Sequence, residues 1–191
     1  VHETLDEGGW RRLVRLSKAT AKGWYYSLRY PWILEVGTRV KVTGKLLIKG
    51  GGSVEFGDFV SIRGDFGRPV GINVASDARL SIGSNTFLNN DAYFEVAQCV
   101  EIGERCIIGP GLNVYDRNGH YRDIVSQEEG VVVGDDVWIG AGSTLLPGTD
   151  IGSGVIVGAR SVVNGKISEN TLVAGVPASK VRDLPPPDER E

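Results

Sequence analysis

The stretch VVVGDDVWIGAGSTLLPGTDIGSGVIVGARSVVNG, residues 131–165, decides the fold of this chain. An aliphatic residue occupies every sixth position, most often followed by glycine or asparagine, and a small or β-branched residue comes four places later. A period of six fits neither an α-helix nor a freely alternating strand. It indicates a parallel β-helix, in which three hexapeptides complete one triangular coil. The aliphatic positions are Val133, Ile139, Leu145, Ile151, Val157 and Val163.

The repeat also predicts which residues stack inside the β-helix. Each aliphatic residue points to the axis and lies over its counterpart one coil, or three repeats, later. The expected pairs are Val133 with Ile151, Ile139 with Val157, and Leu145 with Val163. The rule continues upstream at Val96, Ile102, Ile108 and Val114 and becomes irregular before them.

The remaining composition is that of one packed domain. Of 191 residues, 41% are hydrophobic and 24% charged, and the 27 glycines are explained by the repeat. Neither a membrane-spanning segment nor a signal peptide is recognisable, so we expect a cytoplasmic protein. Cys99 and Cys106 are too few for a disulfide framework, and we expect both to be reduced. The predicted organisation is all-β, with a basic helical segment at 1–36, the β-helix at 37–168 and a cap with an extended, mobile tail at 169–191.

The basic segment is the most charged part of the chain. Residues 8–34 contain no acidic residue, and six Lys or Arg residues alternate with apolar ones. Such an amphipathic helix can dock on the end of the β-helix with its charges solvated, or it can contact an anionic membrane surface or glycan. The cluster is short and the chain is acidic overall, with a net charge of −3, so no nucleic-acid partner is expected.

A polar loop at 115–132 interrupts the repeat, and loops on rigid scaffolds often carry functional residues. It contains His120, and the only other histidine is His2, near the first residue of the chain. An imidazole can take a proton from a hydroxyl near neutral pH, so His120 is the candidate general base. Four carboxylates are candidates to orient its ring, and the sequence leaves the choice open: Asp116, Asp123, Glu128 and Glu129.

Three segments carry a family resemblance: residues 131–165, TLVAGVPASKVR at 171–182, and IGERCIIGPGLNVYDRNGH at 102–120. They resemble the hexapeptide-repeat O-acetyltransferases of the maltose and galactoside acetyltransferase type. The aromatic and basic N-terminal region is more similar to acetyltransferases of exopolysaccharide assembly. The resemblance implies a left-handed β-helix and a homotrimer that binds acetyl-CoA between neighbouring subunits and uses no metal.

The resemblance also implies roles for individual residues. The Ala141 N–H would donate to the oxyanion that develops on the thioester. Gly140 and Gly158 would leave room for the cofactor arm, Ala159 would lie along the pantetheine, and Arg182 with Lys180 would lie near the nucleotide phosphates. The acceptor would contact Asn89 and Asp91. Asp91 departs from the asparagine of the family, and a carboxylate cannot donate as an amide does.

The predicted function is acetyl transfer from acetyl-CoA to a hydroxyl of a sugar or polysaccharide unit. One alternative keeps the scaffold and changes the acceptor to an amino sugar, its nucleotide conjugate, or an antibiotic hydroxyl. Another is a non-catalytic trimeric β-helix that serves as a scaffold. A zinc carbonic anhydrase on this fold would need three histidine ligands, which this chain does not have.

Overall fold

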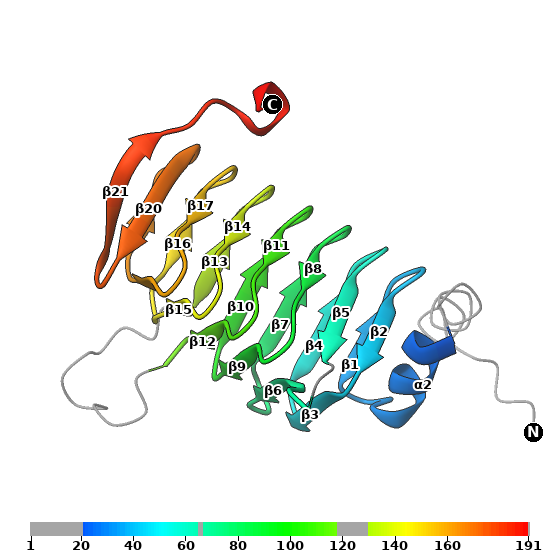
Figure 1. Ribbon diagram of the computed structural model, residues 1–191. Coiled ribbons are helices and arrows are strands. Elements are labelled where there is room, and N and C mark those ends of the chain that lie inside the picture. Colours follow the sequence, from blue (N-terminus) through cyan, green and yellow to red (C-terminus); the bar gives the residue numbers. More distant parts are fainter. Residues whose placement is uncertain (1–20, 65–66, 118–129, 191) are drawn as a thin grey trace, which may run out of the picture.

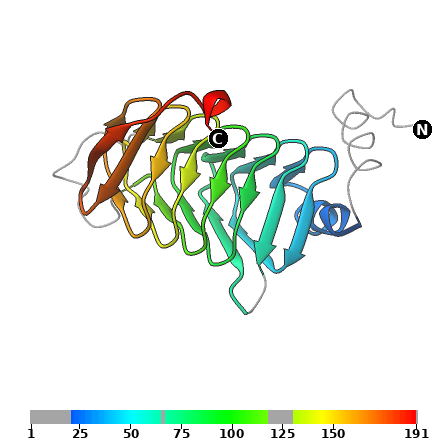
Figure 2. The same cartoon turned by 45° about the horizontal axis from the view of Figure 1, so that its top comes forward.

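The computed structural model describes residues 21–64, 67–117 and 130–190, which form one elongated parallel β-helix (Figure 1). A short helix, α2 (Ala21–Arg29), lies at one end, and a hairpin lies at the other. Between them the strands stack in three sheets that make the sides of a triangular prism, as the oblique view shows (Figure 2). The all-β class expected from the repeat is confirmed.

Each sheet takes one strand from every coil. Sheet A contains β1 (Leu34–Val36), β4 (Ser53–Phe56), β7 (Arg79–Ile82), β10 (Cys99–Ile102), β13 (Val131–Val133), β16 (Asp150–Ile151) and β19 (Lys166–Ile167). Sheet B contains β2 (Lys41–Gly44), β5 (Ser61–Gly64), β8 (Phe87–Leu88), β11 (Ile107–Ile108), β14 (Trp138–Ile139), β17 (Ile156–Val157), β20 (Thr171–Gly175) and β21 (Ala178–Asp183). Sheet C contains β3 (Leu46–Gly50), β6 (Val70–Val74), β9 (Tyr93–Val96), β12 (Asn113–Tyr115), β15 (Thr144–Leu145) and β18 (Val162–Val163).

The stacking predicted from residues 131–165 is confirmed. Three parallel pairs have the expected partners: Val133 with Ile151, Ile139 with Val157, and Leu145 with Val163. Upstream the register differs, because Val114 pairs with Phe94 and not with Val96. Val96 pairs with Val74 in the preceding coil, so both Phe94 and Val96 of β9 face the core.

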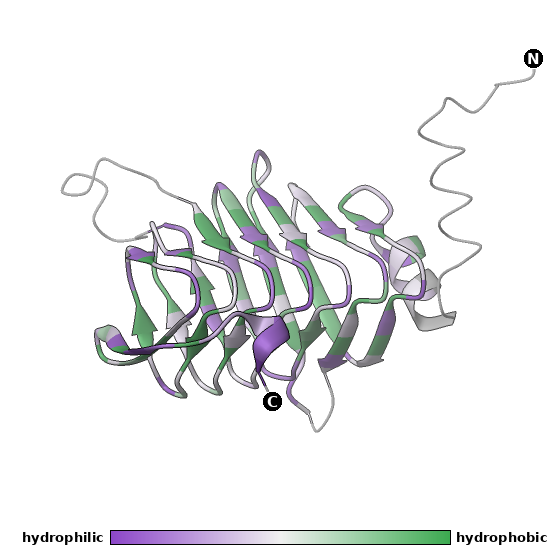
Figure 3. Ribbon diagram, turned by 90° about the horizontal axis from the view of Figure 1, so that it is seen from above, coloured by the Kyte–Doolittle hydropathy of each residue, from purple (hydrophilic) through white to green (hydrophobic). Residues whose placement is uncertain are grey.

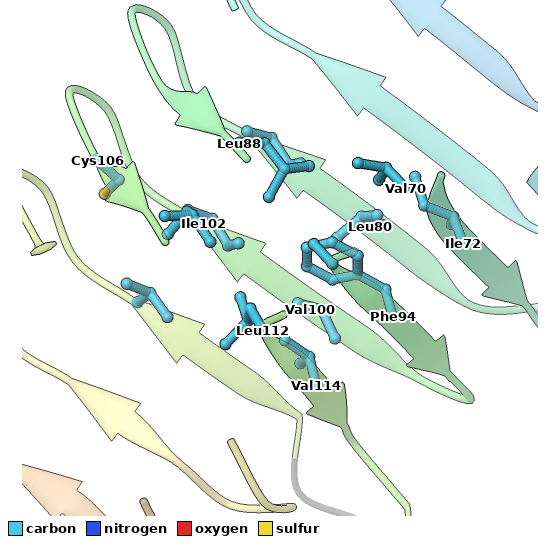
Figure 4. Close-up of a cluster of buried hydrophobic side chains, with 14 of the residues drawn as sticks. Val70, Ile72, Leu80, Leu88, Phe94, Val100, Ile102, Cys106, Leu112 and Val114 are labelled. Carbon is cyan, nitrogen blue, oxygen red and sulfur yellow. The ribbon is translucent and has the colours of Figure 1, made fainter. Parts of the chain in front are cut away.

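Alternation along the strands builds the core. Inward residues are buried and outward ones are partly or fully exposed, which Figure 3 shows as alternating hydrophobic and hydrophilic colour. Phe94, Leu80 and Leu112 are fully buried and lie close together in the interior (Figure 4). Burying one such side chain contributes roughly 1.5–3 kcal/mol, so the axial stack is the main source of stability.

Coils differ in length, and the extra residues of the longer coils lie in the bends between sheets. Successive partners in sheet A lie 20, 26, 20, 31, 18 and 16 residues apart, although the strands pair without interruption. We name the bends by the sheets they join: the A/B, B/C and C/A corners. The two longest coils carry their extra residues at the B/C corner around 64–69 and at the C/A corner from 116 to 130.

Helix α2 covers the first coil. Tyr26 is buried, and its hydroxyl accepts a hydrogen bond from the Leu46 amide at 3.1 Å and donates to the Gly44 carbonyl at 3.2 Å. The described part of the basic segment is therefore docked on the β-helix, and residues 1–20 lie outside the described residues. Sheet A begins at Leu34, inside the segment assigned to 1–36 from the sequence.

The C-terminal end is closed by a hairpin and a short tail. Strand β21 pairs antiparallel with β20 and is the last strand of sheet B. A turn of 3-10 helix, η1 (Pro187–Glu189), follows it. Arg190 then donates to the carbonyls of Gly154 at 2.6 Å and Pro185 at 2.8 Å. Arg190 thereby joins the tail to an A/B corner.

Both cysteines are free thiols, as expected. Cys106 is buried in the stack, and burial raises the pKa of its thiol to about 11. Among the described residues no helix is long and apolar enough to cross a bilayer.

Candidate active site

The B/C corner holds the Ala141 amide in a fixed, exposed position. The Ala141 carbonyl accepts a hydrogen bond from the Arg160 amide at 2.8 Å, and the neighbouring Gly142 amide donates to the Pro110 carbonyl at 2.8 Å. The Gly140 amide on the other side donates to the Val157 carbonyl at 2.8 Å. The N–H of Ala141 itself has no acceptor within the described ranges. This corner therefore presents one rigid backbone donor to the outside.

The glycine before Ala141 is required by the close approach of the coils. A Cβ on Gly140 would lie 2.5 Å from the Ala159 nitrogen, closer than any side chain tolerates. A Cβ on Gly158 would lie 2.9 Å from the Ala174 Cβ. These two glycines let the Ala141 and Ala159 turns stack directly on one another.

Buried serines support the same corner from inside. The hydroxyl of Ser143 lies 2.9 Å from the Gly140 carbonyl and 3.1 Å from the Gly158 carbonyl, and it can donate to one of them at a time. Ser161 repeats the arrangement one coil later, donating to the Gly158 carbonyl at 2.7 Å. The serines four places after Ile139 and Val157 thus satisfy corner carbonyls that would otherwise be buried without partners.

Ala159 is equivalent to Ala141 on the next coil. It is exposed, and its N–H likewise lacks an acceptor among residues 21–64, 67–117 and 130–190. Two outward amides therefore follow one another along one corner, about 4.8 Å apart per coil. Such a pair can bind successive carbonyl oxygens of an extended ligand.

The predicted cations lie on the hairpin beyond these amides. Lys180 and Arg182 are exposed on β21, which pairs with β20 next to the coil of Ala159. The Lys180 ammonium forms an ion pair with Asp183 at 2.6 Å, whereas Arg182 has no acidic partner in the described part of the chain. Arg182 is thus the cation on this strand that can meet an anionic group.

The predicted acceptor residues also lie at the B/C corner, two coils before Ala141. Asn89 is half-buried, and its side-chain oxygen accepts a hydrogen bond from the Asn90 amide at 2.9 Å. Asp91 is exposed, has a positive φ of 63°, and lies 3.7 Å from Arg68. Two coils correspond to about 10 Å, so one corner brings together the candidate donor and acceptor residues.

The proposed base and three of its candidate partners lie outside the described residues: His120, Asp123, Glu128 and Glu129. The fourth candidate, Asp116, is fully buried. Its two carboxylate oxygens accept the amides of Ala97 at 2.6 Å and Gln98 at 2.7 Å. Asp116 therefore clamps the C/A corner from which the loop leaves, and it is an unsuitable partner for His120.

Sequence reasoning missed a pocket on the outer face of sheet C. It has a volume of about 380 Å³ and extends from Leu47 and Lys49 across Gly71 and Asn73 to Asp91 and Tyr93. The outward residues Asn73, Tyr93 and Glu95 of β6 and β9 were visible in the sequence, but their neighbours on adjacent strands could not be assigned without the coil lengths. The Tyr93 hydroxyl donates to Glu95 at 2.5 Å, and this bond together with burial raises the pKa of Tyr93 to about 12.

Among the described residues no group of three or more His, Cys, Asp or Glu side chains is placed to hold a metal ion.

Comparison with known proteins agrees with this architecture. Residues 130–165 match the family model for the bacterial transferase hexapeptide (six repeats). The Escherichia coli K12 protein WbbJ, whose name describes a lipopolysaccharide biosynthesis O-acetyl transferase, is 34% identical over 151 residues, covering 71% of this chain and 74% of its own.

Two solved structures have the same fold. A Vibrio cholerae hexapeptide-repeat acetyltransferase, VCA0836, crystallised with acetyl-coenzyme A, superposes with a TM-score of 0.58 at 24% identity, covering 92% of this chain and 85% of that one. A maltose O-acetyltransferase from Clostridium difficile superposes with a TM-score of 0.59 at 22% identity, covering 96% and 80%. The repeat, the β-helix that it builds and the similarity to WbbJ together show that this chain belongs to the hexapeptide-repeat acetyltransferase family.

Proposed function

We propose that this protein transfers an acetyl group from acetyl-CoA to a hydroxyl of a sugar or polysaccharide unit. The observation that carries the proposal is the rigid, exposed and unpaired N–H of Ala141. A preorganised backbone donor stabilises an oxygen that gains negative charge, and removal of such a donor typically costs about 2.7–4 kcal/mol in the transition state.

The mechanism is a single displacement. His120 accepts the proton of the acceptor hydroxyl while that oxygen attacks the thioester carbonyl carbon. The Ala141 N–H donates to the carbonyl oxygen as it becomes negative. The carbon–sulfur bond then breaks, and the imidazolium of His120 returns the proton to the sulfur, so the products are the acetyl ester and free coenzyme A.

The residues of the B/C corner fit acetyl-CoA. The consecutive amides of Ala141 and Ala159 match an extended ligand with several carbonyl oxygens, such as pantetheine. Gly140 and Gly158 keep side chains away from its path. Arg182, and Lys180 beside it, offer positive charge to phosphates at the far end.

The acceptor is proposed from two observations. Asn89 and Asp91 lie on the same corner as Ala141, and amide and carboxylate groups are suited to sugar hydroxyls. The name of WbbJ refers to lipopolysaccharide, and the similarity to WbbJ supports a sugar acceptor for this protein. No feature of the described residues favours an amino sugar, an antibiotic or a purely structural role.

A homotrimer completes the proposal. A row of apolar residues runs along the outer face of sheet B, through adjacent strands at Phe87, Ile107, Trp138, Ile156 and Leu172. Ile107 and Trp138 are about half exposed, at 52% and 53%. A second copy covering this row would border the B/C corner and make the groove for acetyl-CoA an intersubunit one. We infer that the enzyme works in the cytoplasm, where acetyl-CoA is made.

The test is acetyl transfer by the wild type and by His120→Ala, measured as free thiol released from acetyl-CoA. The expected loss of a general base is about 10²–10⁴-fold in kcat. Arg182→Ala should instead raise the KM for acetyl-CoA with little change in kcat. Full activity of His120→Ala would overturn the mechanism, and transfer to an amino sugar or to chloramphenicol but to no sugar hydroxyl would overturn the acceptor class.

A further inference from the structure

The pocket on sheet C is a surface built for a ligand larger than one sugar ring. Two rows of outward side chains cross β3, β6 and β9. One row contains Leu47, Gly71 and Tyr93, and the other contains Lys49, Asn73 and Glu95. Tyr115 on β12 extends the second row. Three strand intervals of about 4.8 Å make this row about 14 Å long.

Gly71 determines how the Tyr93 ring lies. A Cβ on Gly71 would be 3.0 Å from Cδ2 of Tyr93, so the ring leans over the glycine and close to the sheet. Its hydroxyl is fixed by Glu95, and Tyr93 as a residue is 36% exposed. A ring held in this way presents a flat apolar face, which suits the C–H face of a pyranose.

The polar groups beside the ring are ordered. The Asn73 side-chain amide donates to the first oxygen of Glu95 at 2.8 Å, and the Tyr93 hydroxyl donates to the second oxygen. Both oxygens of the Glu95 carboxylate are therefore engaged by the protein's own donors. The side-chain oxygen of Asn73 remains as an acceptor for a ligand hydroxyl.

Lys49 supplies a positive charge to the lining of the pocket. Its side chain is exposed at the end of the polar row, and its ammonium forms no ion pair with any carboxylate in the described ranges. The Asp91 charge at the other end is close to Arg68, at 3.7 Å. An anionic group on a ligand would thus meet a free cation at Lys49.

The position of the pocket relates it to the candidate active site. Asp91 and Ala92 form one wall, and Asp91 belongs to the corner that carries Asn89 and leads to Ala141. A chain of sugars whose reacting unit lies at Asn89 would continue over Tyr93 towards Lys49. A single sugar at the corner would not reach Lys49.

We propose that this pocket is an acceptor subsite for an oligosaccharide, in which a sugar unit next to the acetylated one stacks on Tyr93 and carries a negative charge that Lys49 binds. The inference rests on the proposed function, because it extends the acceptor from a sugar to a charged glycan chain. It assigns Tyr93, Gly71 and Lys49 as specificity-determining residues.

The experiment measures acetyl transfer to two acceptors by the wild type and by four variants. Wild-type protein, Tyr93→Ala, Gly71→Val, Lys49→Ala and the control Lys41→Ala are assayed with a neutral monosaccharide and with a uronate-containing tetrasaccharide. Lys41 is also exposed but lies on sheet B. Tyr93→Ala and Gly71→Val should raise the KM for the tetrasaccharide about tenfold, the equivalent of one lost aromatic contact. The monosaccharide constants should stay within about twofold of the wild type.

Charge is tested by replacing the uronate with the uncharged sugar in the tetrasaccharide. Lys49→Ala should weaken the charged acceptor and leave the uncharged one unchanged, Lys49→Arg should restore binding, and Lys41→Ala should change neither. Equal effects of the variants on both acceptors, or on the monosaccharide as much as on the tetrasaccharide, would overturn the subsite.

Calorimetric titration of the tetrasaccharide, without acetyl-CoA, separates this inference from the proposed function. Binding by the wild type that Tyr93→Ala weakens supports the subsite even if no transfer is detected. Transfer to the sugars with no calorimetric difference between wild type and Tyr93→Ala would overturn the subsite and leave the proposed function intact.

Discussion

Ser143 shows how a single buried hydroxyl determines the geometry of the candidate oxyanion donor. The side chain is fully buried, yet its oxygen is within 3.1 Å of two corner carbonyls on different coils. The same repeat position carries a hydroxyl at other corners too, because the Thr149 hydroxyl lies 2.6 Å from the Leu146 carbonyl and 3.1 Å from the Val163 carbonyl. What distinguishes Ser143 is its place directly behind the Gly140–Ala141 turn.

Ser143→Ala is predicted to destabilise the protein by about 1–3 kcal/mol, because it leaves a buried carbonyl without its donor. It should also raise the KM for acetyl-CoA, since the Gly140–Ala141 turn loses its inner support. Thermal or urea unfolding and steady-state kinetics measure the two effects. Ser153→Ala is the control: its hydroxyl accepts the Asp135 amide at 3.1 Å on the A/B corner, so only stability should change. An unchanged KM in Ser143→Ala would contradict the proposed support.

At this scale the sequence predicts the residues whose position follows from the six-residue register. Ala141 and Ala159 follow a glycine at fixed places in the repeat, so their shared corner could be predicted. Tyr93, Gly71 and Lys49 could not be brought together in this way. Their pairing depends on partners that lie 24 and 22 residues apart in sheet C, and those spacings are set by bends that carry no periodic signal.

At the scale of elements, sheets A and B differ in their outer faces although both are built from the same repeat. Sheet A presents mostly charged residues, including Glu35, Glu55, Glu101 and Asp150 in one row. Sheet B presents the apolar row through Ile107 and Trp138. A contiguous exposed apolar surface rimmed by polar residues marks an interaction site, and sheet B is the face suited to a second copy.

The double variant Ile107→Lys/Trp138→Lys is predicted to convert the proposed trimer into a monomer of 20.5 kDa, because two charges would be buried in the apolar contact. Light scattering coupled to size exclusion measures the mass. Val132→Lys is the matched control, since Val132 is 42% exposed but lies on sheet A. A trimer that survives in the double variant, or a wild type that is already monomeric, would show that sheet B is not the interface.

At the scale of the whole molecule, the two ends of the stack are closed differently. The C-terminal end is covered by its own hairpin, and the N-terminal end is covered by α2, which turns part of its surface outward. Tyr25 is 55% exposed, Leu28 is 53% exposed and Trp32 is 91% exposed. Arg29 lies among them, and the preceding residues from Gly8 contain only basic charges. Aromatic and basic side chains in this combination suit the interfacial region of an anionic membrane.

The full chain is predicted to sediment with vesicles that contain phosphatidylglycerol and not with pure phosphatidylcholine. Trp32→Ala and Arg29→Glu should each reduce the bound fraction, while Phe59→Ala should not, because Phe59, which is 50% exposed, lies at an A/B corner and not on or beside α2. Added salt should also release the protein. Equal binding by wild type and Trp32→Ala would show that this end of the molecule does not bind the membrane and that α2 only covers the end of the β-helix.

The variable bends have an evolutionary consequence. A strand of this β-helix is hydrogen-bonded to the coil before it and to the coil after it. This pairing does not depend on the number of residues in the bends that join the sheets. Residues can be inserted, deleted or exchanged at a bend while every rung of the scaffold stays in place. New acceptor preferences can therefore arise by changes at the bends, without any change to the strands.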